Sequence, residues 1–201
     1  MESDAYFERL LASLAASYDV VRDAQIVSRR VDALAQLRAL NSKYVLSKKH
    51  VLWEANAYDH ALILRVQTLT AAMVEDWFTF LTREAEPELV HPGASCPPEG
   101  HMASTLTLIL IAEAVEPEAA RAVRRAKFSK SYRFSLRGWA TGRAAAADLG
   151  GGCVHASRDA KDLERHLLGL MRAHSGKLIR AALTRRTLHR YDTKGTKERP
   201  L

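Results

Sequence analysis

The chain of 201 residues is long enough for one domain with a full core, and its 47% apolar and 26% charged residues are the composition of a globular protein and exclude a disordered one. The formal net charge of +7 is unevenly distributed, because residues 1–118 hold 10 Lys and Arg against 17 Asp and Glu, whereas residues 119–201 hold 20 against 6. The two cysteines, Cys96 and Cys153, are too few for a disulfide framework and are expected to be thiols in a reducing compartment.

The sequence indicates no targeting or membrane segment. The first residues lack the basic start and unbroken apolar stretch of a signal peptide. The apolar run at 106–112 is far too short to span a bilayer. We therefore expect a cytoplasmic protein with one domain over residues 1–174 and a basic C-terminal extension over residues 175–201.

The first predicted element is an amphipathic helix over residues 4–18, with Ser3 as its N-cap, that docks on a sheet. Its apolar face consists of Phe7, Leu10, Leu11, Leu14 and Tyr18. Over residues 29–40 apolar and polar residues alternate as in a strand, although several of them are good helix formers. The alternation favours a strand.

An antiparallel meander is predicted next. Three short apolar runs, at 43–46, 51–55 and 60–66, are separated by polar stretches. We interpret Asn56-Ala-Tyr-Asp59 as a hairpin turn, because Asn and Asp side chains can bond the local backbone.

A helix is predicted from Thr70, which can cap it, to about Glu84, and Pro87 is expected to prevent its continuation. The segment 86–102 then contains four prolines and two glycines. It is too long for an ordinary connection, so we interpret it as either a functional loop or a flexible one.

The central strand of the sheet is predicted at residues 103–113. This stretch is apolar with almost no alternation, is rich in Ile and Thr, and lies between a Pro/Gly-rich loop and Glu116-Pro117. Continuous burial of this kind is typical of strands that helices cover on both faces. A helix over 117–127 and a strand over 131–137 follow, which gives the chain two strand-helix-strand crossovers.

The rest of the domain is predicted to add two strands and a helix. Residues 143–149 resume the sheet, Gly150-Gly-Gly152 provides a turn, and Cys153-Val-His-Ala156 forms a short strand. Ser157 is expected to cap a packed helix. Residues 177–190 are expected to form a second, basic helix. The predicted fold class is α+β, a mixed β-sheet with an antiparallel N-terminal meander, two crossovers, helices packed on the sheet and a basic C-terminal helix and tail.

One candidate activity is that of a metal-dependent nuclease. Nucleases of the restriction-enzyme class place carboxylates and a lysine on a strand hairpin beside a parallel strand, and Asp32, Glu54 and Asp59 lie at comparable positions. The signature of these enzymes is an acidic residue, one spacer and a lysine, and neither Glu54 nor Asp59 has a lysine two residues later. Solvent-facing acids are therefore the favoured interpretation, with a hydrolase that uses Glu54, Asp59 and His101 as the alternative.

A zinc site is a second candidate, because five residues supply thiolate and imidazole groups. They are His91, Cys96, His101, Cys153 and His155. The first three are each separated by four residues in a Pro-rich loop, unlike the close ligand pairs of structural zinc sites. Cys153 and His155 point to the same side only if their strand is regular. We therefore predict no metal and no other cofactor.

Residues 119–201, the basic part of the chain, give the main indication of function. Over residues 124–143 cationic residues are interleaved with aromatic ones, a combination that can neutralise phosphates and stack bases. The candidate binding residues are Arg124, Arg125, Lys130, Arg133, Arg137, Lys177, Arg180, Arg185 and Arg186. Strand alternation would place Tyr132, Phe134 and Leu136 in the core and leave only the polar residues between them facing outward.

We therefore expect a binding or interaction module whose partner is nucleic acid, bound without sequence specificity, or an acidic protein. The alternatives are the nuclease-like hydrolase and a structural subunit of a larger assembly.

Several short stretches of the chain resemble an uncharacterised family of bacterial proteins from anaerobes. They are Leu52-Trp-Glu-Ala55 with Tyr58-Asp-His60, His101-Met102 before the Thr/Leu/Ile strand, Phe128-Ser-Lys-Ser-Tyr-Arg-Phe-Ser-Leu-Arg-Gly-Trp139, and Asp148-Leu149. The resemblance covers about residues 5–172 and leaves the basic C-terminal segment as an addition. It implies a bacterial cytosolic protein and carries over no activity.

Overall fold

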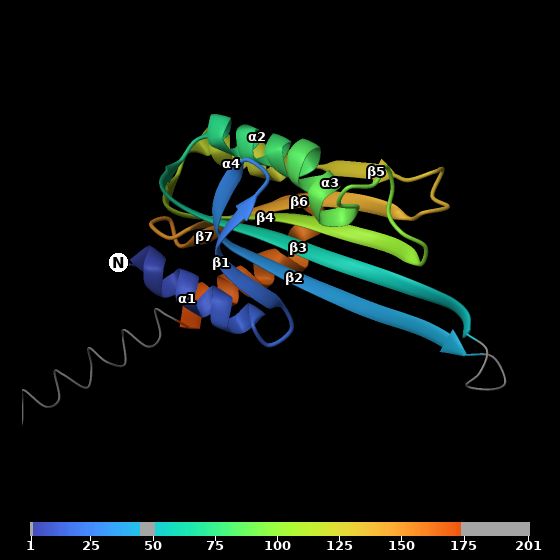
Figure 1. Ribbon diagram of the computed structural model, residues 1–201. Helices are drawn as coiled ribbons and strands as arrows, with labels where there is room; N and C mark the ends of the chain where they lie inside the picture. Colours follow the sequence, from blue (N-terminus) through green and yellow to red (C-terminus); the bar gives the residue numbers. More distant parts are fainter. Residues whose placement is uncertain (1, 45–50, 174–201) are drawn as a thin grey trace, which may run out of the picture.

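The computed structural model describes residues 2–44 and 51–173 of the chain. A mixed sheet of seven strands forms the middle layer between two layers of helices (Figure 1). The strands are β1 (Asp19–Ile26), β2 (Arg29–Tyr44), β3 (Val51–Leu69), β4 (His101–Val115), β5 (Phe128–Ser131), β6 (Trp139–Asp148) and β7 (Cys153–Ala156). The helices are α1 (Glu2–Leu14), α2 (Ala71–Phe80), α3 (Glu86–Val90) and α4 (Pro117–Arg125), and residues 161–173 are also helical.

The sheet has the order β1-β2-β3-β4-β6-β5, and β7 pairs with the part of β6 beyond β5. Strands β1, β2 and β3 are antiparallel, whereas β4 is parallel to both of its neighbours, β3 and β6. The α+β class, the antiparallel N-terminal meander and the helices packed on the sheet are therefore confirmed.

The predicted central strand is β4, which lies in the middle of the sheet. Its side chains alternate between two core clusters. On one face Leu106, Leu108 and Leu110 pack against α2 and α4. On the other face Ile109 and Ile111 pack against α1 and the last helix. All five are 1% exposed or less. Because both faces of β4 are covered, the strand is apolar on both faces here, apart from the buried Thr107, and shows no alternation.

Strand β3 differs from the prediction, because it runs unbroken from Val51 to Leu69. The expected turn at residues 56–59 lies inside this strand, where it pairs with residues 37–40 of β2. The chain reverses instead between Tyr44 and Val51, outside the described residues. Strand β1 was not predicted, and α1 ends at Leu14 rather than at residue 18.

Thr70 caps α2 as predicted, and its Oγ1 accepts a hydrogen bond of 3.3 Å from the Met73 backbone N–H. Pro87, however, does not end the helical segment. A π-helical turn at Leu81–Ala85 separates α2 from α3, and Pro87 lies in the first turn of α3, where its missing N–H is tolerated. The irregular part of the predicted 86–102 loop is therefore shorter than expected.

Both predicted crossovers are present, from β3 through α2 to β4 and from β4 through α4, but the second one leads to β6 rather than to residues 131–137. Residues 132–138 form a turn in which Arg133, Phe134 and Ser135 have φ angles of 46°, 54° and 69°. This left-handed conformation breaks the alternation predicted for a strand. Tyr132 is buried, but Phe134 is 99% exposed and Leu136 is 84% exposed.

The C-terminal part has the predicted hairpin of β6 and β7 around the glycines at 150–152. Ser157 makes no side-chain cap; its Oγ accepts a hydrogen bond of 3.1 Å from the Ala144 backbone N–H instead. Leu163 and Leu167 of the last helix are buried. The predicted extension over residues 175–201 lies outside the described residues, and within them no helix is long and apolar enough to cross a membrane.

We expect Leu108→Asp to prevent folding, because it would place an unpaired charge in the fully buried middle of β4, at a cost of more than about 4 kcal/mol. Circular dichroism and urea unfolding would measure the effect. Val21→Asp is the matched control, because Val21 is half exposed on β1 and the same substitution there should be tolerated. Cooperative unfolding of Leu108→Asp at the wild-type urea concentration would contradict the assigned role of β4.

Candidate functional site

Asp59 lies on the face of the sheet that packs against α1 and is enclosed by partners. Its carboxylate accepts a hydrogen bond of 2.9 Å from the Tyr18 hydroxyl and one of 3.4 Å from the Thr107 hydroxyl. The Arg143 guanidinium lies 3.4 Å from the same carboxylate and also pairs with Asp162. Burial raises the pKa of Asp59, and Arg143 opposes this effect. These contacts fix β3 to β4 and β6.

His101 lies at the start of β4, with its ring on the opposite face. Its Nδ1 is 2.8 Å from the Arg137 carbonyl oxygen and its Nε2 is 2.9 Å from the Ser104 hydroxyl. Because a carbonyl oxygen only accepts, Nδ1 carries the proton and Nε2 accepts from Ser104. Burial lowers the pKa of His101, so the ring is neutral at pH 7.

The His101 ring belongs to a buried cluster around Glu86. His101 stacks on Tyr58 and meets the edge of Tyr132, with centroid distances of 5.9 Å for both. The Tyr132 hydroxyl donates to Glu86, the Lys130 Nζ is 2.7 Å from the other carboxylate oxygen, and Glu86 itself is 1% exposed. The cluster joins α3 to β4 and β5, and both oxygens of the Glu86 carboxylate have partners in it.

The alternative catalytic set is therefore not assembled as a whole. Asp59 and His101 lie on opposite faces of the sheet, since the partners of Asp59 belong to the α1 face and Tyr132 packs with the α2 and α4 side. Asp32 accepts hydrogen bonds from the backbone and side chain of Arg65. Glu54 lies on β3 opposite Ser42, and its side chain is outside the part of the chain that is described.

The candidate nucleic-acid-binding residues fall into three groups. Arg124, Arg125 and Arg133 are exposed and form no ion pair within the described residues. Lys130 and Arg137 are partly exposed and pair with Glu86 and Glu99. The remaining candidates lie in the undescribed C-terminal segment, and they are Lys177, Arg180, Arg185 and Arg186.

The five residues weighed as zinc ligands do not meet in one place. His91 and His101 flank Tyr132 near the start of β4, whereas Cys153 and His155 lie on β7, next to a part of β6 opposite the end of β4. At about 3.3 Å per strand residue, about 35 Å of sheet separates His101 from that end. Cys96 and Cys153 are both free thiols.

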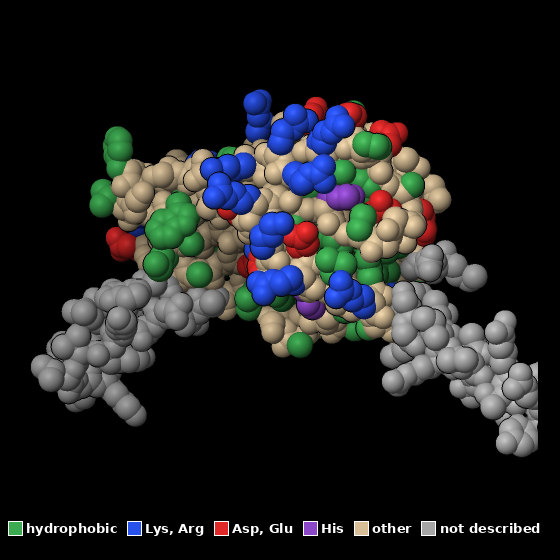
Figure 2. Space-filling model, turned by 180° about the vertical axis from the view of Figure 1, so that it is seen from behind, with side chains coloured by type: hydrophobic (Ala, Val, Ile, Leu, Met, Phe, Trp, Pro, Cys, Tyr) green, Lys and Arg blue, Asp and Glu red, His purple; other side chains and the backbone are tan. Residues whose placement is uncertain are grey.

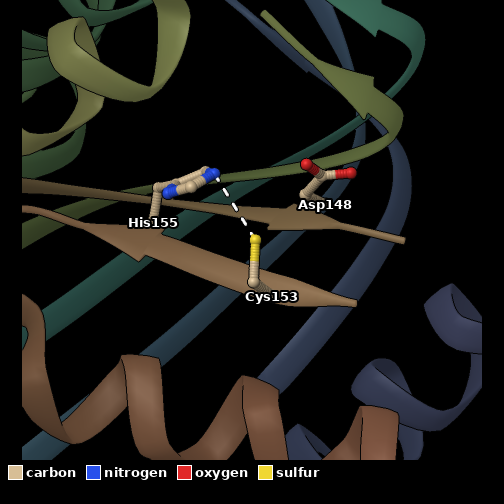
Figure 3. Close-up of side chains that lie close together, drawn as sticks. All are labelled: Asp148, Cys153 and His155. Carbon is tan, nitrogen blue, oxygen red and sulfur yellow. Dashed lines mark hydrogen bonds between the residues drawn. The ribbon is translucent and has the colours of Figure 1, made fainter. Parts of the chain in front are cut away.

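Cys153 and His155 instead meet Asp148, which the sequence reasoning did not single out (Figure 3). Asp148 is the register partner of Cys153 in the β6–β7 hairpin, so both side chains lie on one face, and His155 follows two residues later on the same side. The three-glycine turn between two short strands was the signal that could have found Asp148, because a tight hairpin brings its flanking residues together.

A scan against protein-family models matched residues 2–168 to the family described as Domain of unknown function (DUF8052). The chain belongs to this family. The match confirms the resemblance to an uncharacterised family inferred from the sequence. Comparisons with curated proteins and with solved structures each found no match.

The DUF8052 domain also contains a buried histidine, His60, on the same face as His101. The Gln36 Nε2 lies 3.0 Å from its Nδ1, and its Nε2 has no hydrogen-bond partner within the described residues. Burial lowers the pKa of His60 to about 4, and His101 contributes to the same effect. His60 is therefore a neutral core residue whose protonation opposes folding.

We expect the free energy of unfolding to fall as the pH drops from about 6.5 towards 4. In this interval His60 takes up a proton in the unfolded chain but stays neutral in the folded one. The contribution of His60 is on the order of 3 kcal/mol over this interval. Urea unfolding at several pH values should show a flatter profile for His60→Phe than for the wild type. His166→Gln, which changes an exposed histidine, should keep the wild-type slope, and an equal slope in His60→Phe would contradict the assignment.

Proposed function

We propose that this DUF8052 domain binds single-stranded nucleic acid without sequence specificity through a basic-aromatic surface. This surface consists of Arg124, Arg125, Lys127, Lys130, Arg133, Phe134 and Trp139, which follow one another in the sequence from the end of α4 through the edge strand β5 to the start of β6. The full exposure of Phe134 beside Arg133 is the observation that carries the proposal.

The exposed aromatic side chains support base stacking. The sequence pattern had suggested that Phe134 would enter the core, which would have left only cations for a ligand. The left-handed turn presents Phe134 to solvent instead, and Trp139 is 39% exposed nearby in the chain. Aromatic faces combined with arginines bind successive bases of a single strand with little preference for sequence, because every base has a π-face.

The charge distribution supports contacts with phosphates. Within residues 119–173 there are 12 Lys and Arg against 4 Asp and Glu, a net charge of +8. Figure 2 has Lys and Arg side chains gathered over the middle of one face, while hydrophobic side chains project at the end where β5 and β6 lie. A cationic face next to exposed aromatic groups would attract a polyanion and hold its bases.

A groove beside the proposed surface offers a path for a strand. It lies between α2 and α4 and is lined among others by Phe78, Thr79, Arg125 and Lys127. Arg125 and Lys127 thus belong both to the groove and to the basic-aromatic surface. The nuclease-like alternative has less support, because Asp32, Asp59 and Glu86 are each occupied by a cationic partner.

We expect the full chain to bind fluorescent oligonucleotides of different sequence with similar affinity, and log K to fall linearly with log salt. With four or five phosphates neutralised, the slope should be about −3, at about −0.7 per phosphate of a single strand. Fluorescence anisotropy between low and moderate salt would measure it. Absence of binding to single-stranded DNA and RNA at low salt would refute the proposal and leave an acidic protein as the partner to test.

Two kinds of variant should separate the roles of charge and stacking. Arg125→Ala should make the salt slope shallower by about 0.7, whereas Phe134→Ala should weaken binding by about 1–3 kcal/mol with the slope unchanged. Arg22→Ala removes an exposed arginine on β1, at the opposite edge of the sheet, and serves as the control. If Arg22→Ala reduced the affinity as much as Arg125→Ala, binding would depend on net charge rather than on this surface.

A combined variant, Lys177→Ala with Arg180→Ala, Arg185→Ala and Arg186→Ala, tests the C-terminal candidates in the full chain. We expect weaker binding and a shallower salt slope with an unchanged melting temperature, because these residues follow the packed domain in the sequence. Unchanged affinity in this variant would confine the proposed site to the basic-aromatic surface.

A further inference from the structure

The β6–β7 hairpin places three different metal-binding groups next to one another. One donor atom from each of Asp148, Cys153 and His155 lies within 4.8 Å of the other two. The side chains are partly buried and lie on the face of the sheet that carries α4, where Figure 3 shows them on the two neighbouring strands. Their role is not explained by the nucleic-acid-binding surface.

The spacing of sulfur and nitrogen matches that of ligands on one metal ion. The Cys153 Sγ lies 3.6 Å from the His155 Nε2. A tetrahedral zinc ion with bonds of about 2.3 Å to sulfur and about 2.0 Å to nitrogen holds two such ligands about 3.5 Å apart. Without a metal, the two groups make a weak thiol–imidazole hydrogen bond at this distance.

We propose that Asp148, Cys153 and His155 bind a zinc ion. Thiolate, imidazole and carboxylate together suit zinc, whereas the hard cations magnesium and calcium prefer sites made of oxygen atoms alone. The three protein ligands leave a fourth position on the solvent side for water. Zinc binding here does not rest on the proposed nucleic-acid binding, although Arg124 lies close to both sites.

The turn between the strands holds the carboxylate in place. The Gly151 backbone N–H donates a hydrogen bond of 2.8 Å to the Asp148 Oδ1, which leaves the other oxygen free for a metal. A Cβ at position 151 would lie 2.5 Å from the Asp148 Oδ2, so a larger residue there would displace this carboxylate. This hydrogen bond to one carboxylate oxygen fixes the direction in which the other oxygen points.

Zinc binds a deprotonated thiolate and a neutral imidazole. Binding at Cys153 and His155 therefore displaces the thiol proton, and the affinity is expected to rise with pH.

Arg124 is the group that must move when the metal binds. Its Nη1 lies 3.3 Å from the His155 Nδ1 and donates to it, which places the ring proton on Nε2. Coordination through Nε2 shifts this proton to Nδ1, and Arg124 then turns to solvent. The movement is local because Arg124 is already exposed on the last turn of α4.

Cobalt(II) is the probe, because it replaces zinc in such sites and reports a bound thiolate by a charge-transfer band in the near ultraviolet. We expect the reduced full-length protein to bind one Co²⁺ with this band, to lose the band when Zn²⁺ is added, and to bind more tightly at pH 8 than at pH 6. Zn²⁺ should also raise the melting temperature with increasing concentration.

Matched variants assign the signal to this site. Cys153→Ser should abolish the band, and His155→Gln and Asp148→Asn should each weaken Co²⁺ binding by about 10-fold or more. Cys96→Ser is the control, because Cys96 lies in the 91–100 loop far from the hairpin and its loss should change nothing. Arg124→Ala should bind Co²⁺ at least as tightly as the wild type, since it removes a competing cation, while it weakens nucleic-acid binding.

Three results would overturn the proposal. One is the absence of the band at pH 8 in protein whose two thiols are reduced. Another is a band that persists in Cys153→Ser and disappears in Cys96→Ser. The third is Co²⁺ binding that none of the three ligand substitutions weakens, which would indicate an adventitious ion only. Circular dichroism of each variant would verify that the fold is retained, and any one folded ligand variant suffices for the comparison.

Discussion

The requirement to bury β4 on both faces determines how the rest of the chain is arranged. Its neighbours β3 and β6 are both parallel to it, so both connections are crossovers, and these run in the same direction across the sheet. Two crossovers of the same hand and direction place their helices on one face, where α2 and α4 lie. The other face must therefore be covered by elements from outside the crossovers. It is covered by α1 and by the helix at 161–173, which explains why the two ends of the domain meet on the same side of the sheet.

The features predictable from sequence were those that depend on nearby residues or on continuous burial. The apolar character of β4 and the Thr70 cap are of this kind, and both were found as expected. The turn at 132–138 was not predictable, because its alternation is that of a strand and only the backbone shows that Phe134 leaves the core. The separation of Asp59 from His101 also required the structure, since it depends on which face each strand residue occupies after a register shift next to Asn56.

Ion pairs inside the domain occupy several of its acidic and basic side chains. Asp32 is paired with Arg65, Asp59 with Arg143, and the buried Glu86 with Lys130. The last two of these pairs join an acid from the N-terminal half to a cation from the C-terminal half across the sheet. Such pairs hold strands and helices in register, and removing Lys130 would leave the buried Glu86 without its ion-pair partner, which is costly. Arg124, Arg125, Lys127 and Arg133 are exposed and take no part in these pairs, so they are available to a ligand.

The two proposed sites lie along one edge of the sheet because β5 and β7 pair with successive parts of β6. Arg124 is the residue that belongs to both, since it is one of the proposed phosphate contacts and also donates to the His155 Nδ1. A metal bound at Nε2 would put a proton on Nδ1 and release the guanidinium from the ring. The released group would then be free to meet a phosphate, so zinc and nucleic acid would each favour the binding of the other. Thermodynamic linkage requires zinc and nucleic acid to raise the affinity for each other by the same factor. The coupling free energy is limited to that of one contact, because Arg124 exchanges its hydrogen bond to His155 for one to a phosphate.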